Sequence, residues 1–452
     1  LTNSKKIVFT AGSIRPAPRW GAEPQQPPRG RPERSRGVTV ALWTLGPFLA
    51  ATTLLAFWRP RVTLLLPLVF HAGYLLRSRV LLGGLDLPTT LLELLIGLAV
   101  MVGMLHARAE IGAALRALPR PFLLFALVFA LSATVSAAVA PHPRTAWGQW
   151  KAFVVEPLAY AVVLLPLLRA AEGRTAVARA LLWGGRLSLA VGTTTADFGR
   201  LRGIYDVPNS LALMLAPLIA FATGLSLHSS FPAVRRLSKV SLALFLPTLL
   251  LTQSLGGVLA AAVGACASLW RRRRWLILVF FLLLIATAIQ LGTGKLGHAV
   301  ADDSPLRARL QIWRVSLALL RDHPVLGTGL GTFEPAYQQK LHELLAQPSG
   351  EYVLRSPLEW VVRDPHNILL SFWLHTGLLG LLSVTALVAF SLFRAQFTPP
   401  RFSPLSAASG AALLALLVFG LVDVPYWKND LSVLWWGYVL LAAILPTDTE
   451  RD

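Results

Sequence analysis

Residues 364–380 read DPHNILLSFWLHTGLLG, and they join a polar segment of the chain to an apolar run. Apolar runs of similar length recur along the sequence, which is 55% hydrophobic and only 14% charged. Long runs with few charges are typical of helices that cross a membrane, because a helix satisfies its own backbone polar groups in lipid. The sequence therefore predicts an all-α, polytopic integral membrane protein.

Apolar runs between charged breaks define the candidate spans. A span needs roughly 20 residues, and the run 62–76 is short for that length. The count of transmembrane helices is therefore twelve or thirteen. The runs are 39–58, 62–76, 86–105, 121–140, 152–168, 177–193, 207–227, 240–253, 255–270, 275–293, 367–393, 405–423 and 430–446.

Basic residues in short loops predict the orientation of the spans. Arg235, Arg236 and Lys239 precede one span, and the run 271–274 separates two others, so these loops should be cytoplasmic. Each span crosses the membrane once, so counting the spans after these loops places one long loop, 294–365, on the periplasmic side and the tail 447–452 on the cytoplasmic side. That loop divides the transmembrane helices into an N-terminal set, 39–293, and a C-terminal set, 366–446.

Residues 1–38 are rich in Pro, Arg and Gln and are expected to form a disordered basic tail. Twelve spans would place this tail inside, as its charge favours, whereas thirteen would place it outside. The sequence begins with Leu, which suggests a fragment or a misassigned start.

The formal net charge of +20 is spread over this tail and the inner loops, so it indicates membrane topology and anionic lipids and argues against nucleic acid. Cys266 lies in an apolar span and is expected to be buried filler. The sequence shows no zinc-ligand spacing, phosphate-binding glycine loop, nucleophile elbow or dinucleotide fingerprint. We therefore expect no cofactor and no metal.

Residues 305–322 predict an amphipathic helix within the long loop, lying on the membrane surface. Its apolar stripe is Leu306, Leu310, Trp313, Leu317 and Leu320. A row of arginines, Arg307, Arg314 and Arg321, flanks this stripe and would reach the headgroups. Arg309 lies on the other flank, where its guanidinium fork suits a phosphate.

His366 follows Pro365, so His366 and Asn367 are expected in the first turn of the next span, where water meets lipid. His375 would face the opposite side of that helix and is interpreted as packing. Two further polar segments, 199–209 and 251–257, should face outward and are candidates for the same cavity as His366.

These motifs together resemble the O-antigen ligase and polymerase superfamily of bacterial membrane glycosyltransferases, over residues 120–446. The strongest is His366-Asn367, nine residues, Gly377, two residues, Gly380. Supporting matches are Arg309 with Trp313, the turn from His323-Pro324 to Gly327 and Gly329, and Arg202-Gly203 followed by Pro208-Asn209. The chain departs from the pattern at 252–256, TQSLG, where relatives carry a basic residue.

The resemblance implies transfer of a glycan from undecaprenyl diphosphate to an acceptor hydroxyl, such as one of lipid A-core, on the periplasmic face of the inner membrane. It implies an inverting, metal-independent reaction. His366 would be the general base, and Asn367 would orient the site. Arg309 and Arg202 would hold the diphosphate, with Arg200 or Arg314 as a further contact.

Three other functions remain open. A repeat-unit polymerase and a protein O-oligosaccharyltransferase would run the same reaction on other acceptors, and the His-Asn-x9-Gly match favours the ligase. A lipid or polysaccharide transporter would instead use intramembrane charges, for which Glu93, Glu156 and Arg186 are the candidates.

Overall fold

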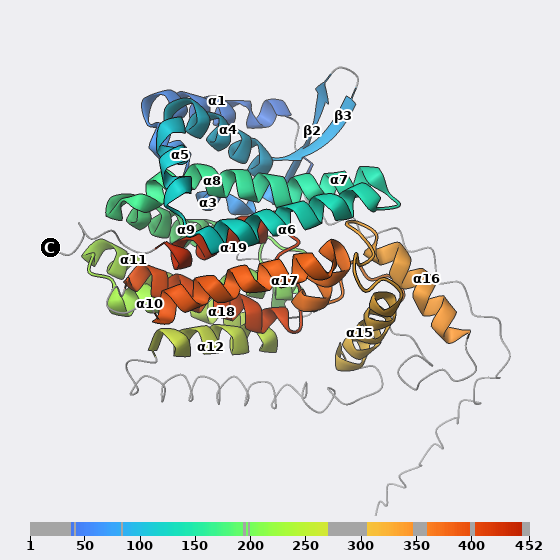
Figure 1. Ribbon diagram of the computed structural model, residues 1–452. Helices are drawn as coiled ribbons and strands as arrows, with labels where there is room; N and C mark the ends of the chain where they lie inside the picture. Colours follow the sequence, from blue (N-terminus) through green and yellow to red (C-terminus); the bar gives the residue numbers. More distant parts are fainter. Residues whose placement is uncertain are drawn as a thin grey trace, which may run out of the picture. The chain divides into compact units, whose positions relative to one another are not determined.

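The computed structural model describes residues 38–39, 42–82, 85–192, 196–197, 199–269, 305–346, 359–397 and 403–444 (Figure 1). Helices make up nearly all of this part of the chain. In the N-terminal set they are α1 Leu42–Trp58, α2 Pro60–Thr63, α3 Leu66–Val69, the 3₁₀ turn His71–Leu75, α4 Leu91–His106, α5 Arg108–Ala117, α6 Arg120–Val139, α7 Pro143–Trp150, the π-helical turn Lys151–Val155, α8 Glu156–Arg169, α9 Ala171–Gly192, α10 Pro208–His228, α11 Pro232–Leu251 and α12 Leu255–Leu269. The later helices are α15 Pro305–Asp322, α16 Phe333–Leu345, α17 Ile368–Phe397, α18 Pro404–Gly420 and α19 Asn429–Ala443.

Four helical segments are long and apolar enough to cross a membrane: Arg120–Val139, Pro143–Arg169, Pro208–His228 and Ile368–Ala395. The pair α4 and α5 passes the same test together but is bent by 95°. Shorter apolar helices accompany them at Leu45–Trp58, Pro60–Val69, Leu255–Ser268 and Pro404–Gly420. The all-α, polytopic membrane class is therefore confirmed.

Some expectations fall on residues that the structure does not describe. They are the basic tail up to residue 37, the span 275–293, part of the loop 294–365 and the tail 447–452. The number of spans and the side on which the chain begins stay predictions.

Two predicted spans differ in the structure. The run 62–76 forms α2, α3 and a 3₁₀ turn instead of one helix; Pro60 is the first residue of α2 and Pro67 the second of α3. The start of the span 86–105 is extended, because β2 Leu76–Leu82 and β3 Leu85–Thr90 pair as an antiparallel hairpin. The short β1, Val38–Thr39, pairs parallel with β2.

The start of α4 is fixed by a capping residue. Thr90 accepts a hydrogen bond from the Glu93 amide at 3.2 Å, and the acidic Glu93 lies in the first turn. A hydroxyl at the N-cap followed three residues later by Glu is a strong helix-start signal. The helix therefore begins at Leu91 and not at residue 86.

α10 lies at the centre of the helix packing and is buried along almost its whole length. It packs against α11, α12 and α18. Small residues permit this close approach: a Cβ at Gly224 would lie 2.7 Å from Ala408 Cβ, and one at Gly264 would lie 2.5 Å from Ala220 Cβ. Glycine and alanine contacts of this kind are the usual means of packing helices inside a membrane.

α17 is broken at Gly377, whose φ of 72° and ψ of 176° are not helical. The glycine-rich turn before α16 fills this break. The Leu378 amide donates to the Val325 carbonyl at 2.8 Å, and the Thr328 and Gly329 amides donate to the Leu374 carbonyl at 2.9 and 3.1 Å. The backbone groups freed by the break are thus satisfied by the turn.

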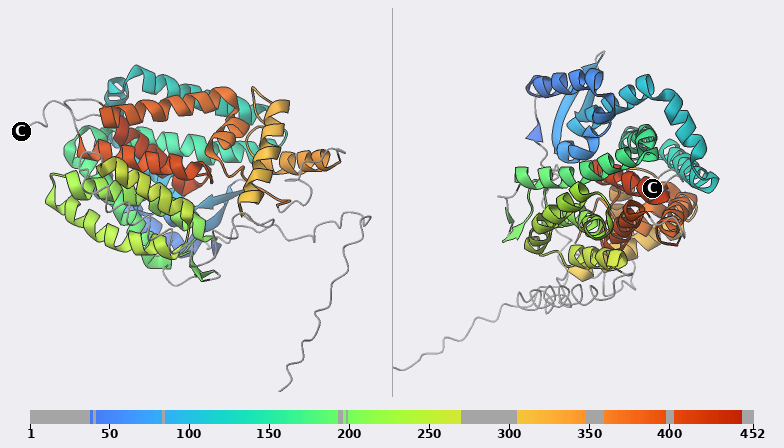
Figure 2. Two further views of the ribbon diagram at one scale, coloured as in Figure 1. Left: turned by 90° about the horizontal axis from the view of Figure 1, so that it is seen from below. Right: turned by 90° about the vertical axis from the view of Figure 1, so that its left-hand side faces the viewer.

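The amphipathic helix predicted over 305–322 is α15, with the expected bounds. Its two faces have different surroundings. Leu306, Leu310 and Leu317 are exposed, while Ile312, Val315, Leu319 and Leu320 are buried with α16, which was not predicted. Figures 1 and 2 show α15 and α16 at the end of the bundle where α17 begins.

Candidate active site

Asn367 is the N-cap of α17. Its Oδ1 accepts hydrogen bonds from the Leu369 and Leu370 amides at 3.0 and 3.1 Å, and its Nδ2 donates to the Leu421 carbonyl at 3.1 Å. The predicted place in the first turn was therefore wrong, because Asn367 and His366 both precede the helix. The amide joins the start of α17 to the end of α18 and thereby fixes the backbone next to His366.

His366 has a left-handed backbone conformation, with φ of 47°. Its Nδ1 is buried and lies 3.5 Å from Asp423 Oδ1, while the side chain as a whole is 41% exposed. The exposed part of the ring is therefore the part away from Asp423. A left-handed conformation at a residue other than glycine costs energy and is often found at functional sites.

Asp423 was not predicted as a site residue, yet it is the carboxylate that faces His366. Its side chain is only 15% exposed, and the Val424 amide donates to Oδ1 at 2.8 Å. Burial alone would raise the pKa of Asp423, but His366 and the positive charge of Lys428 hold that pKa below its usual value. Asp423 is therefore an anion at neutral pH.

Arg309 binds the same turn from α15. Its Nε donates to the Val422 carbonyl at 3.0 Å, and the residue is half-buried. The turn 421–424 thus contacts Asn367, His366 and Arg309 at three successive residues. A guanidinium has five N–H donors, so one bond to a carbonyl leaves the group able to bind an anion as well.

Arg314 lies five residues after Arg309 on α15, which is about 140° around the helix axis. It is half-buried and does not share a face with Arg309. The structure therefore separates these two of the predicted diphosphate contacts.

Arg200 and Arg202 differ in their surroundings. Arg200 lies in a short strand, Arg200–Leu201, that pairs with Ala196–Asp197; its Nε donates to the Thr252 carbonyl at 3.0 Å and its Nη2 to Asn209 Oδ1 at 3.1 Å. Arg202 contacts the Asp206 carbonyl only at 3.5 Å. Arg200 thus links polar segments of the protein, whereas Arg202 is held more loosely.

Of the two outward polar segments expected to share a cavity with His366, the one at 251–257 packs against the turn 421–424, and the one at 199–209 contacts that first segment. A Cβ at Gly256 would lie 3.2 Å from both Phe419 and Val422, so the segment at 252–257 packs on the end of α18. Arg200 in turn binds Thr252 of that segment. Segments far apart in the sequence therefore converge at the end of the bundle where α10, α17 and α19 begin.

A polar network continues from Asp423 toward the start of α19. Lys428 Nζ donates to Ser210 Oγ at 2.7 Å, and the Tyr205 hydroxyl donates to buried Asp430 at 3.3 Å. The sequence signal for this network is the set of charges within 421–430, LVDVPYWKND, between two apolar spans. None of these charged residues was predicted as a site residue.

His375 is buried, as its interpretation as packing predicted. Its ring lies 4.9 Å from that of Trp427, and its Nε2 lies 3.8 Å from Asp364 Oδ1. It is on α17 but it does not join the His366 cluster.

The charges named for a transporter all have partners among the described residues. Lys151 Nζ binds Glu93 Oε2 at 2.8 Å and also binds Glu156. The π-helical turn Lys151–Val155 suits this arrangement, because it places residues five apart on one side. Arg186 stacks on Trp183, with its guanidinium carbon 4.3 Å from the ring centroid.

An apolar groove of about 230 Å³ runs between α17, α18 and α19. It begins at Ile368, directly after Asn367, and continues along α17 to Leu392. Phe372 and Trp435 are its largest lining side chains. Several of its lining residues, among them Leu369 and Ala389, are exposed, so the groove is an open apolar surface that starts beside His366 and follows α17.

Fold and site together define a polytopic membrane protein in which a histidine and an arginine contact one carboxylate-bearing turn near the end of the bundle. Residues 240–385 match the family model described as O-antigen ligase. The match confirms the resemblance to the O-antigen ligase and polymerase superfamily, whose members are ligase- and polymerase-like glycosyltransferases. It covers about a third of the chain, including Arg309, His366 and Asn367 but not Arg202 or Asp423. No curated protein matched the sequence.

Proposed function

We propose that this chain is a glycosyltransferase of the O-antigen ligase type, which moves a glycan from undecaprenyl diphosphate to the hydroxyl of a glycolipid acceptor such as lipid A-core. The observation that carries the proposal is the turn 421–424, against which a histidine and an arginine are both held. A base and a cation side by side are what glycosyl transfer from a diphosphate requires.

In this mechanism His366 is the general base. Asp423 faces Nδ1, so the opposite ring nitrogen, Nε2, would take the proton of the acceptor hydroxyl. The acceptor oxygen then attacks the anomeric carbon, a C–O bond forms, and the bond from that carbon to the diphosphate breaks with its electrons. Direct attack inverts the anomeric centre.

The leaving undecaprenyl diphosphate gains negative charge as that bond breaks. Arg309 and Arg202 would stabilise this charge, and neither needs a metal to do so. Arg200 and Asn367 would hold the backbone around them. The groove that starts at Ile368 would take the first part of the isoprenoid chain, because its lining is almost wholly apolar.

The orientation that fits this role places His366 on the periplasmic side of the bacterial inner membrane. The opposite ends of the helices carry Arg169, Arg174, Arg235 and Arg236, and basic ends favour the cytoplasm. The proposed site then faces the side on which finished lipid-linked glycans are presented.

A repeat-unit polymerase is the second candidate, because it would use the same residues and differ only in its acceptor. Protein O-glycosylation would share them as well. Carrier-linked glycans in a deletion strain distinguish the first two: long polymer that accumulates on the carrier indicates a ligase, and single repeat units indicate a polymerase.

A further inference from the structure

The turn between α15 and α16 exposes two adjacent apolar side chains. Residues 323–331 read HPVLGTGLG, and within them Val325 is 67% exposed and Leu326 is 49% exposed. An exposed apolar residue on its own needs no explanation, because much of any protein surface is apolar. The surroundings of this pair depend on where the turn lies along the helices that cross the membrane.

The turn lies beside α17, well past the start of that helix. A Cβ at Gly377 would lie 2.5 Å from the Val325 carbonyl oxygen and 3.1 Å from Leu326 Cα. Gly377 follows the first residue of α17, Ile368, by nine residues. Nine helical residues extend over about 14 Å. The turn therefore packs against the side of α17 and does not cover its end.

The packing of α6 on α17 relates this position to the bilayer. Ser136 Oγ of α6 donates to the His375 carbonyl at 2.5 Å, and a Cβ at Gly380 would lie 3.5 Å from Ser132 Cβ, so the two helices are antiparallel. α6 has 20 residues, and a helix of that length spans about 30 Å, the thickness of the hydrocarbon layer. Ser136 lies three residues before the end of α6. The exposed pair is thus level with the last turn of α6, inside the length of that apolar helix.

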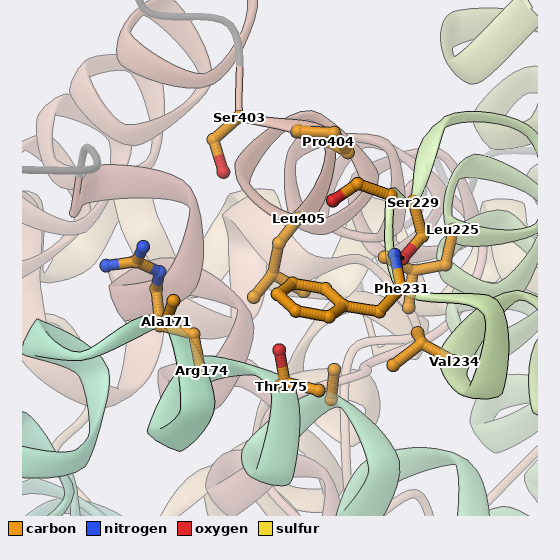
Figure 3. Close-up of a pocket in the computed structure, with 12 residues that line it drawn as sticks. Ala171, Arg174, Thr175, Leu225, Ser229, Phe231, Val234, Ser403, Pro404 and Leu405 are labelled. Carbon is orange, nitrogen blue, oxygen red and sulfur yellow. Dashed lines mark hydrogen bonds between the residues drawn. The ribbon is translucent and has the colours of Figure 1, made fainter. Parts of the chain in front are cut away.

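The other edge of the apolar layer is marked by polar residues at the far end of α17. Arg394 of α17 and Ser406 of α18 donate to adjacent carbonyls at the end of α19. Figure 3 shows Arg174 and Ser403 at a cavity of about 210 Å³ among α9, α10, α11 and α18, where α18 begins. The antiparallel α6 begins at this end with the exposed Arg120. A hydrocarbon layer displaced away from the turn would place that guanidinium in lipid, at a high cost.

The backbone of the turn is bound to α17 and to itself. Besides the bonds that fill the break in α17, the Gly327 amide donates to the His323 carbonyl at 3.0 Å, and Trp373 Nε1 donates to the Pro324 carbonyl at 2.7 Å. Irregular backbone is tolerated at membrane depth where the protein satisfies its polar groups. Residues 324–333 also contain no charged side chain. Both properties suit a turn that enters the apolar layer.

We propose that Val325 and Leu326 insert among the lipid acyl chains of the leaflet on the His366 side and anchor the unit formed by α15 and α16. Other exposed apolar side chains occur at the same height, since Val135 of α6 is 49% exposed and Leu379 of α17 is 60% exposed. Lipid is the occupant because the two helices that hold the turn, α6 and α17, both cross the membrane. The anchor would hold α15, and with it Arg309, at the membrane surface. This inference rests on the membrane fold and is independent of the proposed reaction.

The test uses the full chain in phosphatidylcholine nanodiscs. The sequence has one cysteine, so Cys266→Ala provides a background in which Val325→Cys is labelled with a nitrobenzoxadiazole fluorophore. Leu382→Cys, exposed further along α17, is the reference inside the span, and Gln339→Cys, exposed on α16, is the reference in water. Leu326→Cys is a second reporter of the turn, which keeps the test decisive if the first variant does not fold.

Quenching of each label is measured with aqueous iodide and with lipids that carry a nitroxide either near the headgroup or near the end of the acyl chain. We expect nitroxide lipid to quench the label at 325 at least about threefold more than the label at 339, as insertion into the outer part of the hydrocarbon layer requires. The nitroxide near the headgroup should act more strongly at 325, and the nitroxide near the chain end more strongly at 382. Iodide should quench the label at 339 alone.

Two results would overturn the proposal. Quenching of both turn labels by iodide and not by nitroxide lipid would place the pair in water. Protection of both from every quencher would place the pair against protein, such as a second copy of the chain.

Discussion

Arg309 and His366 are held at adjacent residues of one turn: Arg309 Nε donates to the Val422 carbonyl at 3.0 Å, and His366 Nδ1 lies 3.5 Å from Asp423 Oδ1. The two side chains come from α15 and from the start of α17, more than fifty residues apart in the sequence. Their shared support on this turn is the physical basis of the proposed mechanism.

Replacement of Arg309 by Ala should lower the rate of glycan transfer about a hundredfold, because loss of one charge-stabilising donor typically costs that much. Arg309→Lys should recover part of the rate, since an ammonium keeps the charge and loses the fork. Arg314→Ala is the matched control on the same helix, and its rate should stay within about threefold of the parent. Equal losses at Arg309 and Arg314 would contradict the assignment.

Replacement of Arg202 and replacement of Arg200 should have different effects, the first on glycan transfer and the second on thermal stability. Arg202→Ala should impair transfer while the midpoint of thermal unfolding changes little. Arg200→Ala should lower that midpoint, because it removes the bonds to Thr252 and Asn209 and leaves polar groups unpaired. Measurement of both properties for both variants checks this, and the reverse pattern would exchange their roles.

Asp423 should make the stability of the protein depend on pH. Its pKa in the folded protein is below the usual value, so the unfolded state binds the proton more readily, and the carboxylate stabilises the fold above the unfolded pKa of about 4. This stabilisation is lost as the pH falls through the folded pKa. Asp423→Asn should therefore unfold at lower temperature than the parent between pH 5 and 8, with the difference shrinking below about pH 4. A difference that is independent of pH would show that the charge of Asp423 does not matter.

Gly377→Ala should destabilise the protein by at least about 2 kcal/mol. The φ of 72° disfavours alanine, and the new Cβ would lie 2.5 Å from the Val325 carbonyl oxygen. Gly148→Ala in α7 is the control, because nothing lies within 4 Å of its Cβ and its backbone is helical. The midpoints of thermal unfolding of the two variants are compared. Equal midpoints would contradict the close packing of Gly377 against the turn 325–329.

The groove along α17 should contribute to recognition of the lipid carrier. Ala389→Phe fills it, and should raise the KM for a donor with a long isoprenoid chain more than for a donor with a short one. Leu382→Phe is the matched control, since Leu382 is exposed on the same helix outside the groove. A rise in KM that is the same for both donors would exclude the groove from carrier binding.

Hydropathy predicted most of the fold, because an apolar run of sufficient length has few alternatives to a membrane helix. α6, α10 and α12 therefore begin and end within a few residues of the expected positions. The prediction of one span over 62–76 was wrong because hydropathy does not record where Pro60 and Pro67 interrupt backbone hydrogen bonding. The hairpin before α4 was not predicted, because a short apolar strand and a buried helix can have the same composition.

The site could be predicted only in part. Arg309 and His366 were predicted as candidate site residues from residue type and spacing, and the structure places both against the turn 421–424. Asp423 was missed because its partnership with His366 depends on packing between α17 and α18 that no local pattern encodes. α16 was missed although Phe333, Tyr337 and Leu341, at four-residue spacing, gave a helical signal.

The most direct test of the account is the pool of glycans on undecaprenyl diphosphate in a deletion strain, in the same strain complemented by the unaltered chain, and in one complemented by His366→Ala at equal membrane abundance. We predict that deletion causes carrier-linked glycan to accumulate, that the unaltered chain restores the parental pool, and that His366→Ala does not. Long polymer on the carrier would specify the ligase reaction. A pool unchanged by deletion would contradict glycan transfer, and full restoration by His366→Ala would contradict the general base.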